Sequence, residues 1–358
     1  MNFYEEDTLS APDAMFRAQQ IAFGPFMFQA AMALRDLGIL AALEKHGKEG
    51  ATAREIASEL QLPEYGVKVL AEAGLGMGVL LWNEKERRFS ITKTGRLIEH
   101  DGMTRANMNF VRDVNYRGFS HLQEAVRTGK PSGLVELGDW PTVYHGLASL
   151  PPDVRASWLA FDHFYSDGAF ARALSIVFRH QPRRLLDVGG NTGRWATRCL
   201  AHDPDVEITI ADLPRQIEMA QRALEGVEQR HRVGFHGVDL LDPNGMLPAG
   251  HDAIWMSQVL DCFSLEDIVS ILRRAATVMT PSDNLFILEA YWDRQHHEAS
   301  AFCVQQTSLY FTCVANGTSQ MYHSADVLGC VAEAGLEVVE DIDNVGLSHT
   351  LFRCVRKA

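Results

Sequence analysis

The sequence lacks long apolar runs and any sign of a secretory leader. None of its hydrophobic runs approaches the roughly 20 residues that a membrane-spanning helix needs. The longest one, residues 73–82, is short and interrupted by three glycines. The first residues are acidic and carry no basic region of the kind that begins a signal peptide. We therefore expect a cytoplasmic protein with no membrane partner.

The sequence also lacks cysteine pairs and an excess of positive charge. Its six cysteines are scattered without a C-x-x-C pair, which is typical of reduced thiols and offers no zinc site. No histidine cluster accompanies its acidic motifs, so we expect no metal. The formal net charge of −13 argues against a nucleic-acid partner, because phosphate binding needs a basic surface.

The length of 358 residues suits two domains, and the first begins with an apolar stretch. Residues 16–43 show apolar residues at mixed three- and four-residue spacings, which predicts a helix. The stretch is apolar on more than one face. A helix of this kind is expected to be buried, either in a core or against a partner chain.

A winged-helix pattern follows. Thr52 to Glu55 forms a capping box that begins a short helix, residues 64–74 form a second helix, and residues 79–82 and 89–92 form two strands. Lys68 is the one basic residue of the second helix, which has no arginine or asparagine that could read the edges of DNA bases. This pattern favours a packing and dimerisation module over a DNA-binding domain, and a metabolite-sensing regulator stays as an alternative.

The most informative motif lies in the second half of the chain. Residues 184–188 form an apolar strand, Gly189 to Gly193 form a glycine-rich turn, and residues 194–201 form a helix. Such a turn lets the backbone approach a ligand closely, and the helix beyond offers free N–H groups. The spacing fits neither the G-x-G-x-x-G dinucleotide motif nor a P-loop.

Strands and helices alternate after this motif. Strands are predicted at 206–211, 232–238, 252–257 and 284–290, with helices at 215–224 and 265–279. This alternation predicts an α/β domain with a parallel sheet covered on both faces. Ligands gather at the carboxyl ends of such strands. Acidic residues stand there: Asp187, Asp212, Asp239 and Glu289.

The run from Leu185 to Gly193 resembles the first motif of class I methyltransferases, and Asp212-Leu213-Pro214 matches the D-L-P that follows the second strand in the small-molecule O-methyltransferase family. Gly335-Leu336 matches the turn before the last two strands. The resemblance implies a Rossmann-like domain with a mostly parallel seven-stranded sheet, S-adenosylmethionine as cofactor, and a homodimer. It divides the chain into an N-terminal winged-helix dimerisation domain (1–105), a helical linker (106–180) and a cofactor-binding domain (181–358).

The same resemblance implies the cofactor contacts. The three glycines of the turn would approach the methionine part, Asp212 would hold the ribose hydroxyls, and Asp239 with Leu240 would flank the adenine. The full set of expected cofactor residues is Asp187, Gly189, Gly190, Gly193, Asp212, Leu213, Asp239, Leu240 and Ser257.

The chain departs from the family at the catalytic base. Where the family has a histidine followed by an aspartate, this chain has Asp261 and Cys262, while Glu289 keeps the family's acid. Asp261 would serve as base if burial raised its pKa, so Asp261 and Glu289 are the expected catalytic residues. The expected substrate contacts, which would equally suit plain core packing, are His163, Phe164, Tyr310, Phe311, Met321 and Tyr322.

These observations predict methyl transfer to a small, flat, phenolic or other aromatic acceptor in secondary metabolism. The altered base leaves oxygen and carbon both open as the methylated atom. A second reading keeps the cofactor but not methyl transfer, as in relatives that use the bound sulfonium for decarboxylation or hydroxylation.

Overall fold

A computed structural model describes residues 4–357, which form two units that divide between residues 111 and 112. The predicted boundary at residue 105 falls inside helix α7 (Gly102–Phe110). The stretch expected as a linker, 106–180, belongs almost entirely to the larger unit. Its long helix α10 (Pro152–Phe178) packs into the core of that unit, so the stretch is no separate linker.

The N-terminal unit begins with three helices where one was predicted: α1 (Ala11–Ala22), α2 (Gly24–Asp36) and α3 (Ile39–Lys45). Pro25 stands in the first turn of α2 and has no N–H to bond the preceding turn, so α1 ends before it. Gly38 adopts a left-handed φ of 79°, the conformation that commonly ends a helix. The prediction of one continuous helix was therefore wrong.

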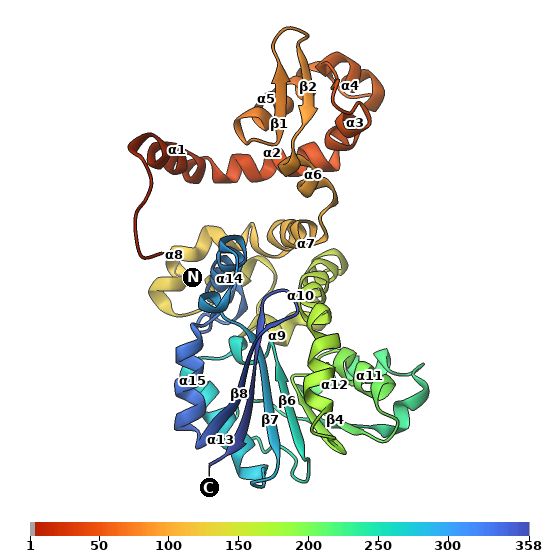
Figure 1. Ribbon diagram of the computed structural model, residues 1–358, viewed down its shortest axis with the longest axis vertical. Coiled ribbons are helices and arrows are strands. Elements are labelled where there is room, and N and C mark those ends of the chain that lie inside the picture. The colour runs from red at the N-terminus through yellow and green to blue at the C-terminus, as the bar shows by residue number, and fades with distance from the viewer. Residues whose placement is uncertain (1–3, 358) are drawn as a thin grey trace. The chain divides into compact units, whose positions relative to one another are not determined.

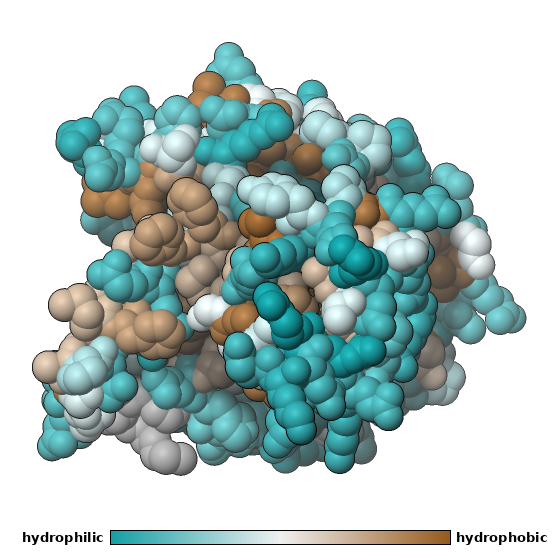
Figure 2. Space-filling view, turned by 90° about the horizontal axis from the view of Figure 1, so that it is seen from above, coloured by the Kyte–Doolittle hydropathy of each residue, from teal (hydrophilic) through white to brown (hydrophobic). Residues whose placement is uncertain are grey.

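None of the residues of helix α1 is buried within the chain, so the prediction of burial in the chain's own core is wrong for α1, and burial against a partner chain stays a prediction. Figure 2 shows apolar side chains gathered on the side where Figure 1 places α1. The large exposed apolar residues of α1 and the start of α2 are Met15, Phe16, Ile21, Phe23 and Phe26. Contiguous exposed apolar surface of this kind marks an interaction site.

The predicted winged-helix elements are confirmed. They are α4 (Ala53–Leu60), α5 (Glu64–Gly76), β1 (Leu80–Asn83) and β2 (Arg88–Ile91), followed by α6 (Lys93–His100). The capping box forms, since the Thr52 side chain accepts from the N–H of Glu55 and the Glu55 side chain accepts from the N–H of Thr52. Leu34, Leu40 and Ile56 lie in the core of this unit.

The larger unit contains a seven-stranded sheet of order β5-β4-β3-β6-β7-β9-β8, in which only β9 pairs antiparallel to its neighbours. Its strands are β3 (Arg184–Val188), β4 (Glu207–Asp212), β5 (Val233–Gly237), β6 (Ala253–Ser257), β7 (Asn284–Ala290), β8 (Leu336–Val345) and β9 (His349–Arg356). The helices besides α10 are α8 (Leu122–Thr128), α9 (Val143–Gly146), α11 (Arg194–His202), α12 (Pro214–Ala223), α13 (Leu265–Val278), α14 (Glu298–Tyr310) and α15 (Ser324–Glu333). The predicted α/β fold is confirmed.

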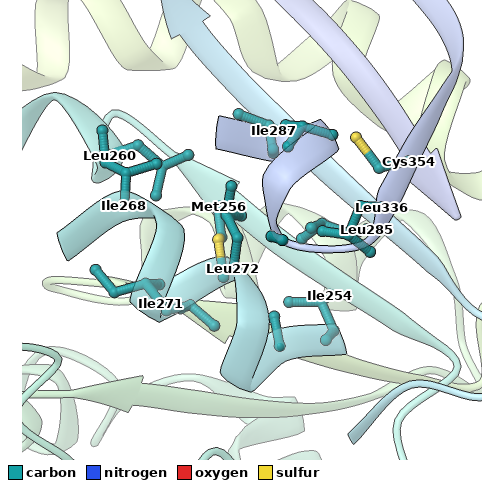
Figure 3. Close-up of a cluster of buried hydrophobic side chains, with 14 of the residues drawn as sticks. Ile254, Met256, Leu260, Ile268, Ile271, Leu272, Leu285, Ile287, Leu336 and Cys354 are labelled. Carbon is teal, nitrogen blue, oxygen red and sulfur yellow. The ribbon is translucent and has the colours of Figure 1, made fainter. Parts of the chain in front are cut away.

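Helices cover both faces of this sheet (Figure 1). Helices α13 and α15 pack on one face, and Figure 3 shows side chains of α13, such as Ile268 and Leu272, against Met256 of β6 and Ile287 of β7. Helices α10, α11 and α12 pack on the other face, where Trp195 stacks on Trp255 with ring centroids 4.2 Å apart. Strands buried on both faces explain the continuous apolar runs in the sequence.

No single helix among residues 4–357 has the length and apolarity of a membrane span. Only α2 and α3 taken together pass that test, and they are bent by 58° at their break.

Candidate active site

The glycine turn joins β3 to α11 at the carboxyl end of the sheet. Gly189 and Gly193 have left-handed φ values of 75° and 77°, which a residue with a Cβ adopts at a cost. A Cβ on Gly189 would also lie 2.6 Å from Cγ2 of Val259. The glycines are therefore required by the shape of the turn and by the side chains packed against it.

Asp212 ends β4 beside this turn and holds it in place. Its Oδ2 accepts from the N–H of Asn191 at 2.9 Å, and its Oδ1 accepts from the N–H of Leu213 at 2.7 Å. Burial raises its pKa to about 6, against the lowering effect of the two N–H groups. Each carboxylate oxygen keeps a second lone pair, so the group can still accept bonds from a ligand.

Asp187 lies beneath the turn. Only 2% of the residue is exposed, and a Cβ on Gly190 would lie 2.7 Å from its Oδ2. Burial and the nearby charge of Asp212 raise its pKa to about 8. The neutral form of the group therefore predominates at physiological pH, and its Oδ2 has no hydrogen-bond partner within residues 4–357.

The loop after β5 carries Asp239 and the buried Leu240. Arg274 of α13 donates to the carbonyls of Leu240, Asp242 and Gly245 at 2.5 to 3.0 Å. These bonds fix the loop in one conformation. Arg274 is 8% exposed, and the sequence offered no sign of this role.

The loop after β6 begins with Ser257 and bends at once. Gln258 has a left-handed φ of 50°, unusual for a residue other than glycine. Glu289, near the end of β7, holds the bend: its Oε1 accepts from the N–H groups of Val259 and Leu260 at 3.1 and 2.9 Å. Glu289 therefore positions the loop, and a catalytic role for it stays a prediction.

Asp261 lies in the short helical turn η6 (Leu260–Cys262) that this bend presents. It is 6% exposed, and its carboxylate accepts from the thiol of Cys262 at 3.3 Å. Burial raises its pKa to about 6, while the thiol bond acts in the opposite direction. For Asp261 to act as a base, the sequence requires that burial raise its pKa. Its pKa is raised in this way.

A second carboxylate faces this region from α10. The side chain of Asp162 keeps 26% of its surface accessible, and its Oδ2 accepts from the side-chain amide of Asn191 at 3.4 Å. Burial and then the charges of Asp261 and Asp167 raise its pKa to about 7. Asp162 thus connects the glycine turn with the surroundings of Asp261.

Three phenol groups lie near Asp261, and one of them, Tyr310, also lies near Asp162. The hydroxyl of Tyr310 accepts from Nε1 of Trp158 at 2.7 Å, and the hydroxyl of Tyr322 donates to the carbonyl of Phe263 at 2.7 Å. Burial raises the pKa of each, and the charge of Asp261 adds to the effect. Tyr144 of α9 is affected in the same way. All of them are neutral at physiological pH.

The structure does not bring every predicted substrate residue to Asp261. His163 lies near Arg194 and Asp167, and burial followed by the charge of Arg194 lowers its pKa. Phe164 contacts Tyr165 edge to face, Phe311 contacts Tyr310, and the main chain of Met321 bonds the hydroxyl of Ser308. Tyr310 and Tyr322 lie nearer to Asp261, and a role in substrate binding stays a prediction for all six residues.

Several residues of the site were missed from the sequence. Asp162 belongs to an aromatic and polar run of the sequence, but its neighbours His163 and Phe164 were predicted as the substrate contacts. The spacing of Trp158 and Asp162, one helical turn apart on α10, was the available signal. No sequence signal marked Asn191 or Tyr144, because only the folded glycine turn and the short helix α9 bring these two residues to the site.

The arrangement suits a nucleoside-bearing ligand beside an acid–base group. Helix α11 begins at Gly193 with no side-chain cap, so its first N–H groups are free for an anionic group. Asp212 stands one strand away with lone pairs free. Asp261 follows β6, the neighbour of β3 on its other side. Each part stands at the carboxyl edge, where doubly wound sheets bind ligands.

Family models match two parts of the chain. Residues 16–89 match a Dimerisation2-like domain, and residues 167–335 match an O-methyltransferase domain. The two matches fall within the N-terminal and the larger unit, respectively.

Curated relatives match over part of their length. The demethylspheroidene O-methyltransferase of Cereibacter sphaeroides is 27% identical over 204 residues, which is 56% of this chain and 52% of that protein. The aclacinomycin 10-hydroxylase RdmB of Streptomyces purpurascens is 28% identical over 220 residues, 60% of this chain and 57% of that protein. The chain thus spans about half the length of these relatives.

Solved structures share the fold over nearly the whole chain. The mitomycin 7-O-methyltransferase MmcR superposes with a TM-score of 0.73 at 20% identity, covering 96% of this chain and 98% of that one. The O-methyltransferase NcsB1, in complex with S-adenosylmethionine and 2-hydroxy-5-methyl naphthoic acid, superposes with a TM-score of 0.68 at 21% identity, covering 93% and 96%. The chain thus combines a segment similar to Dimerisation2-like domains with a segment similar to O-methyltransferase domains.

Proposed function

We propose that the protein transfers a methyl group from S-adenosylmethionine to a small, flat, phenolic or other aromatic acceptor. The observation that carries the proposal is the position of Asp261: a buried carboxylate with its pKa raised to about 6, on a loop beside the glycine turn. The naphthoic acid bound by NcsB1 supports an aromatic hydroxyl compound as acceptor. The names of the relatives support a place in secondary metabolism.

The residues at the carboxyl edge fit the cofactor. We assign the glycine turn and the start of α11 to its methionine part, Asp212 to the ribose hydroxyls, and the loop at Asp239 and Leu240 to the adenine. Asp187 supports the turn from below rather than through a charge, since it is neutral at physiological pH. When bound, the cofactor supplies an electrophilic methyl group on a positively charged sulfur.

The chain's own residues then prepare the acceptor. Asp261, ionised above pH 6, takes the proton of the acceptor hydroxyl and becomes neutral. Glu289 keeps Asp261 in place by holding the N–H groups of Val259 and Leu260. Correct alignment of the two reactants supplies on the order of 7–11 kcal/mol of the rate acceleration in such reactions. The choice between oxygen and carbon as the methylated atom depends on which one faces the donor.

We further propose that the protein works as a homodimer in the cytoplasm. The support is the match to a Dimerisation2-like domain together with the exposed apolar side chains of α1 and α2. A protomer that leaves Phe16, Ile21 and Phe26 in water would gain stability by covering them.

The proposal is tested in two steps. Calorimetric titration with S-adenosylmethionine and S-adenosylhomocysteine is expected to give micromolar binding of both, and Asp212→Ala is expected to weaken both strongly. Incubation with methyl-labelled cofactor and a panel of phenols is then expected to label at least one acceptor. Absence of binding to the wild-type protein would refute the proposal.

A second function has one specific observation in its favour. The relative RdmB is named a hydroxylase, and the usual histidine base is missing here. The chain would then bind the same cofactor for its charge and transfer no methyl group. Labelled cofactor separates the two functions, because only methyl transfer moves the label to the acceptor.

A further inference from the structure

The carboxylate of Asp162 has no assigned role in the proposed reaction, yet it lies where donor and acceptor would meet. Its Oδ2 accepts from the side chain of Asn191 in the glycine turn, which is the cofactor side. Its charge interacts with that of Asp261, which is the acceptor side. A quarter of its side-chain surface stays accessible, so a ligand can reach it.

Within residues 4–357, no protein cation balances this pair of carboxylates. The positive group that acts on Asp162 is Arg194. Its guanidinium is engaged by Asp167, with Nε donating to Oδ1 at 2.9 Å and Nη2 donating to Oδ2. The remaining neighbour, His163, has Nε2 4.0 Å from Oδ2 of Asp162, and burial lowers its pKa. The imidazole is therefore neutral at physiological pH.

A buried carboxylate and a partly accessible one that lie close together are stabilised by a proton or by a cation from a ligand. The neutral phenols Tyr144 and Tyr310 do not supply that charge. The phenolic acceptor does not supply it either. The cofactor brings a positive sulfur to the junction of the glycine turn and the base.

We propose that Asp162 is the anionic partner of the methyl donor's positive charge, so that the site prefers the charged sulfonium over the neutral thioether that remains after transfer. The inference rests on the proposed function. In the transfer the carbon–sulfur bond breaks with its electron pair going to sulfur, a bond forms between that carbon and the acceptor oxygen or carbon, and the acceptor's proton goes to Asp261. The positive charge on sulfur, with which Asp162 interacts, is thereby lost, and this loss favours release of the spent cofactor.

The test measures binding rather than turnover. Dissociation constants are determined by calorimetry for S-adenosylmethionine, for S-adenosylhomocysteine, and for an analogue with a protonated amine in place of the methylsulfonium. Asp162→Asn keeps the shape and an oxygen for Asn191. It is expected to weaken the two charged ligands about tenfold, as for a partly screened charge pair, and the neutral thioether less than about threefold.

The matched control is Asp283→Asn, a buried aspartate at the opposite end of β7 whose carboxylate accepts from the N–H of Thr280 at 2.6 Å. This variant is expected to leave the ratio of the two cofactor affinities unchanged. A pH series on the wild-type protein adds a measurement free of folding effects. Preference for the sulfonium is expected to increase from pH 6 to 8, as Asp162 ionises among Asp261, Asp167, Arg194 and His163.

The outcomes separate the two levels of inference. If the wild-type protein binds neither cofactor form, the proposed function fails. If it binds both and Asp162→Asn weakens them equally, or weakens neither, the proposed function stands and the role of Asp162 is refuted. A preference that does not change with pH in the wild-type protein would refute the role as well.

Discussion

Replacing Asp261 by asparagine is the most informative change to the proposed base. Asparagine keeps the size of the side chain and an oxygen for the thiol of Cys262, but it cannot take a proton. General base catalysis contributes about 10²- to 10⁴-fold to a rate, so we expect the Asp261→Asn variant to lose methyl transfer by that factor. Affinity for S-adenosylhomocysteine, which carries no sulfonium charge, is expected to change less than about threefold.

The same change is expected to make the protein more stable at alkaline pH. The pKa of Asp261 is about 6 in the folded chain, against an ordinary value of 3.8 for an aspartate in water. Between pH 4 and 6 the folded protein therefore holds a proton that the unfolded chain has released, so stability falls as pH rises through this window. Above pH 6 the cost is constant at about 3 kcal/mol. Asparagine carries no such cost.

Two assays check this prediction. Label transfer from the cofactor is followed from pH 5 to 9, where the wild-type rate is expected to rise to a plateau with a midpoint near pH 6. Urea unfolding at pH 8 and pH 4 is expected to show the Asn variant more stable at pH 8 and no more stable than wild type at pH 4. Full activity of Asp261→Asn would refute the role of Asp261 as base, and equal stability at pH 8 would refute its desolvation.

Three further changes test other parts of the structure. Arg274→Met removes the donors to three carbonyls of the loop after β5. It is expected to lower the free energy of unfolding in urea by about 2–4 kcal/mol and to weaken binding of both cofactor forms. Unaltered cofactor affinity would show that the loop is not part of the binding site. His349 is 1% exposed, with a pKa lowered to about 4 by burial, so this residue's own contribution to stability is expected to fall by up to about 3 kcal/mol as pH falls from 6.5 to 4. His349→Leu should remove most of that difference, and urea unfolding at pH 7.5 and 5 measures it. Ile21→Glu, on the exposed face of α1, is expected to convert a dimer into a monomer in light scattering, whereas Glu5→Gln, at an exposed position before α1, should leave the dimer intact.

The fold was predictable because local sequence signals agree with tertiary packing. The apolar strands from β3 to β7 are short and separated by turn residues, so their positions and their parallel direction followed from alternation with helices. The N-terminal stretch was less predictable. Its apolar periodicity continues across Pro25 and Gly38 and therefore predicted a single helix. In the structure, one helix ends before each of these two residues.

The candidate site was predictable only where residues stand at strand ends. Asp212 ends β4, and Asp261 lies four residues beyond the end of β6, so both follow from the predicted positions of these strands. Asp162 lies in the middle of a helix, and its place depends on how α10 packs against the glycine turn. Arg274 acts on main-chain carbonyls of a distant loop, and no residue type or spacing marks such contacts in a sequence.

The exchange of histidine for aspartate changes the charges of the proposed reaction. A neutral histidine base becomes a cation as it takes the proton, so the site keeps one positive charge throughout. An aspartate base begins as an anion beside a cationic donor, and both end neutral. Because Asp261 and its neighbours are buried, the environment favours the loss of opposite charges over their separation. A carboxylate base therefore suits this buried, acidic site.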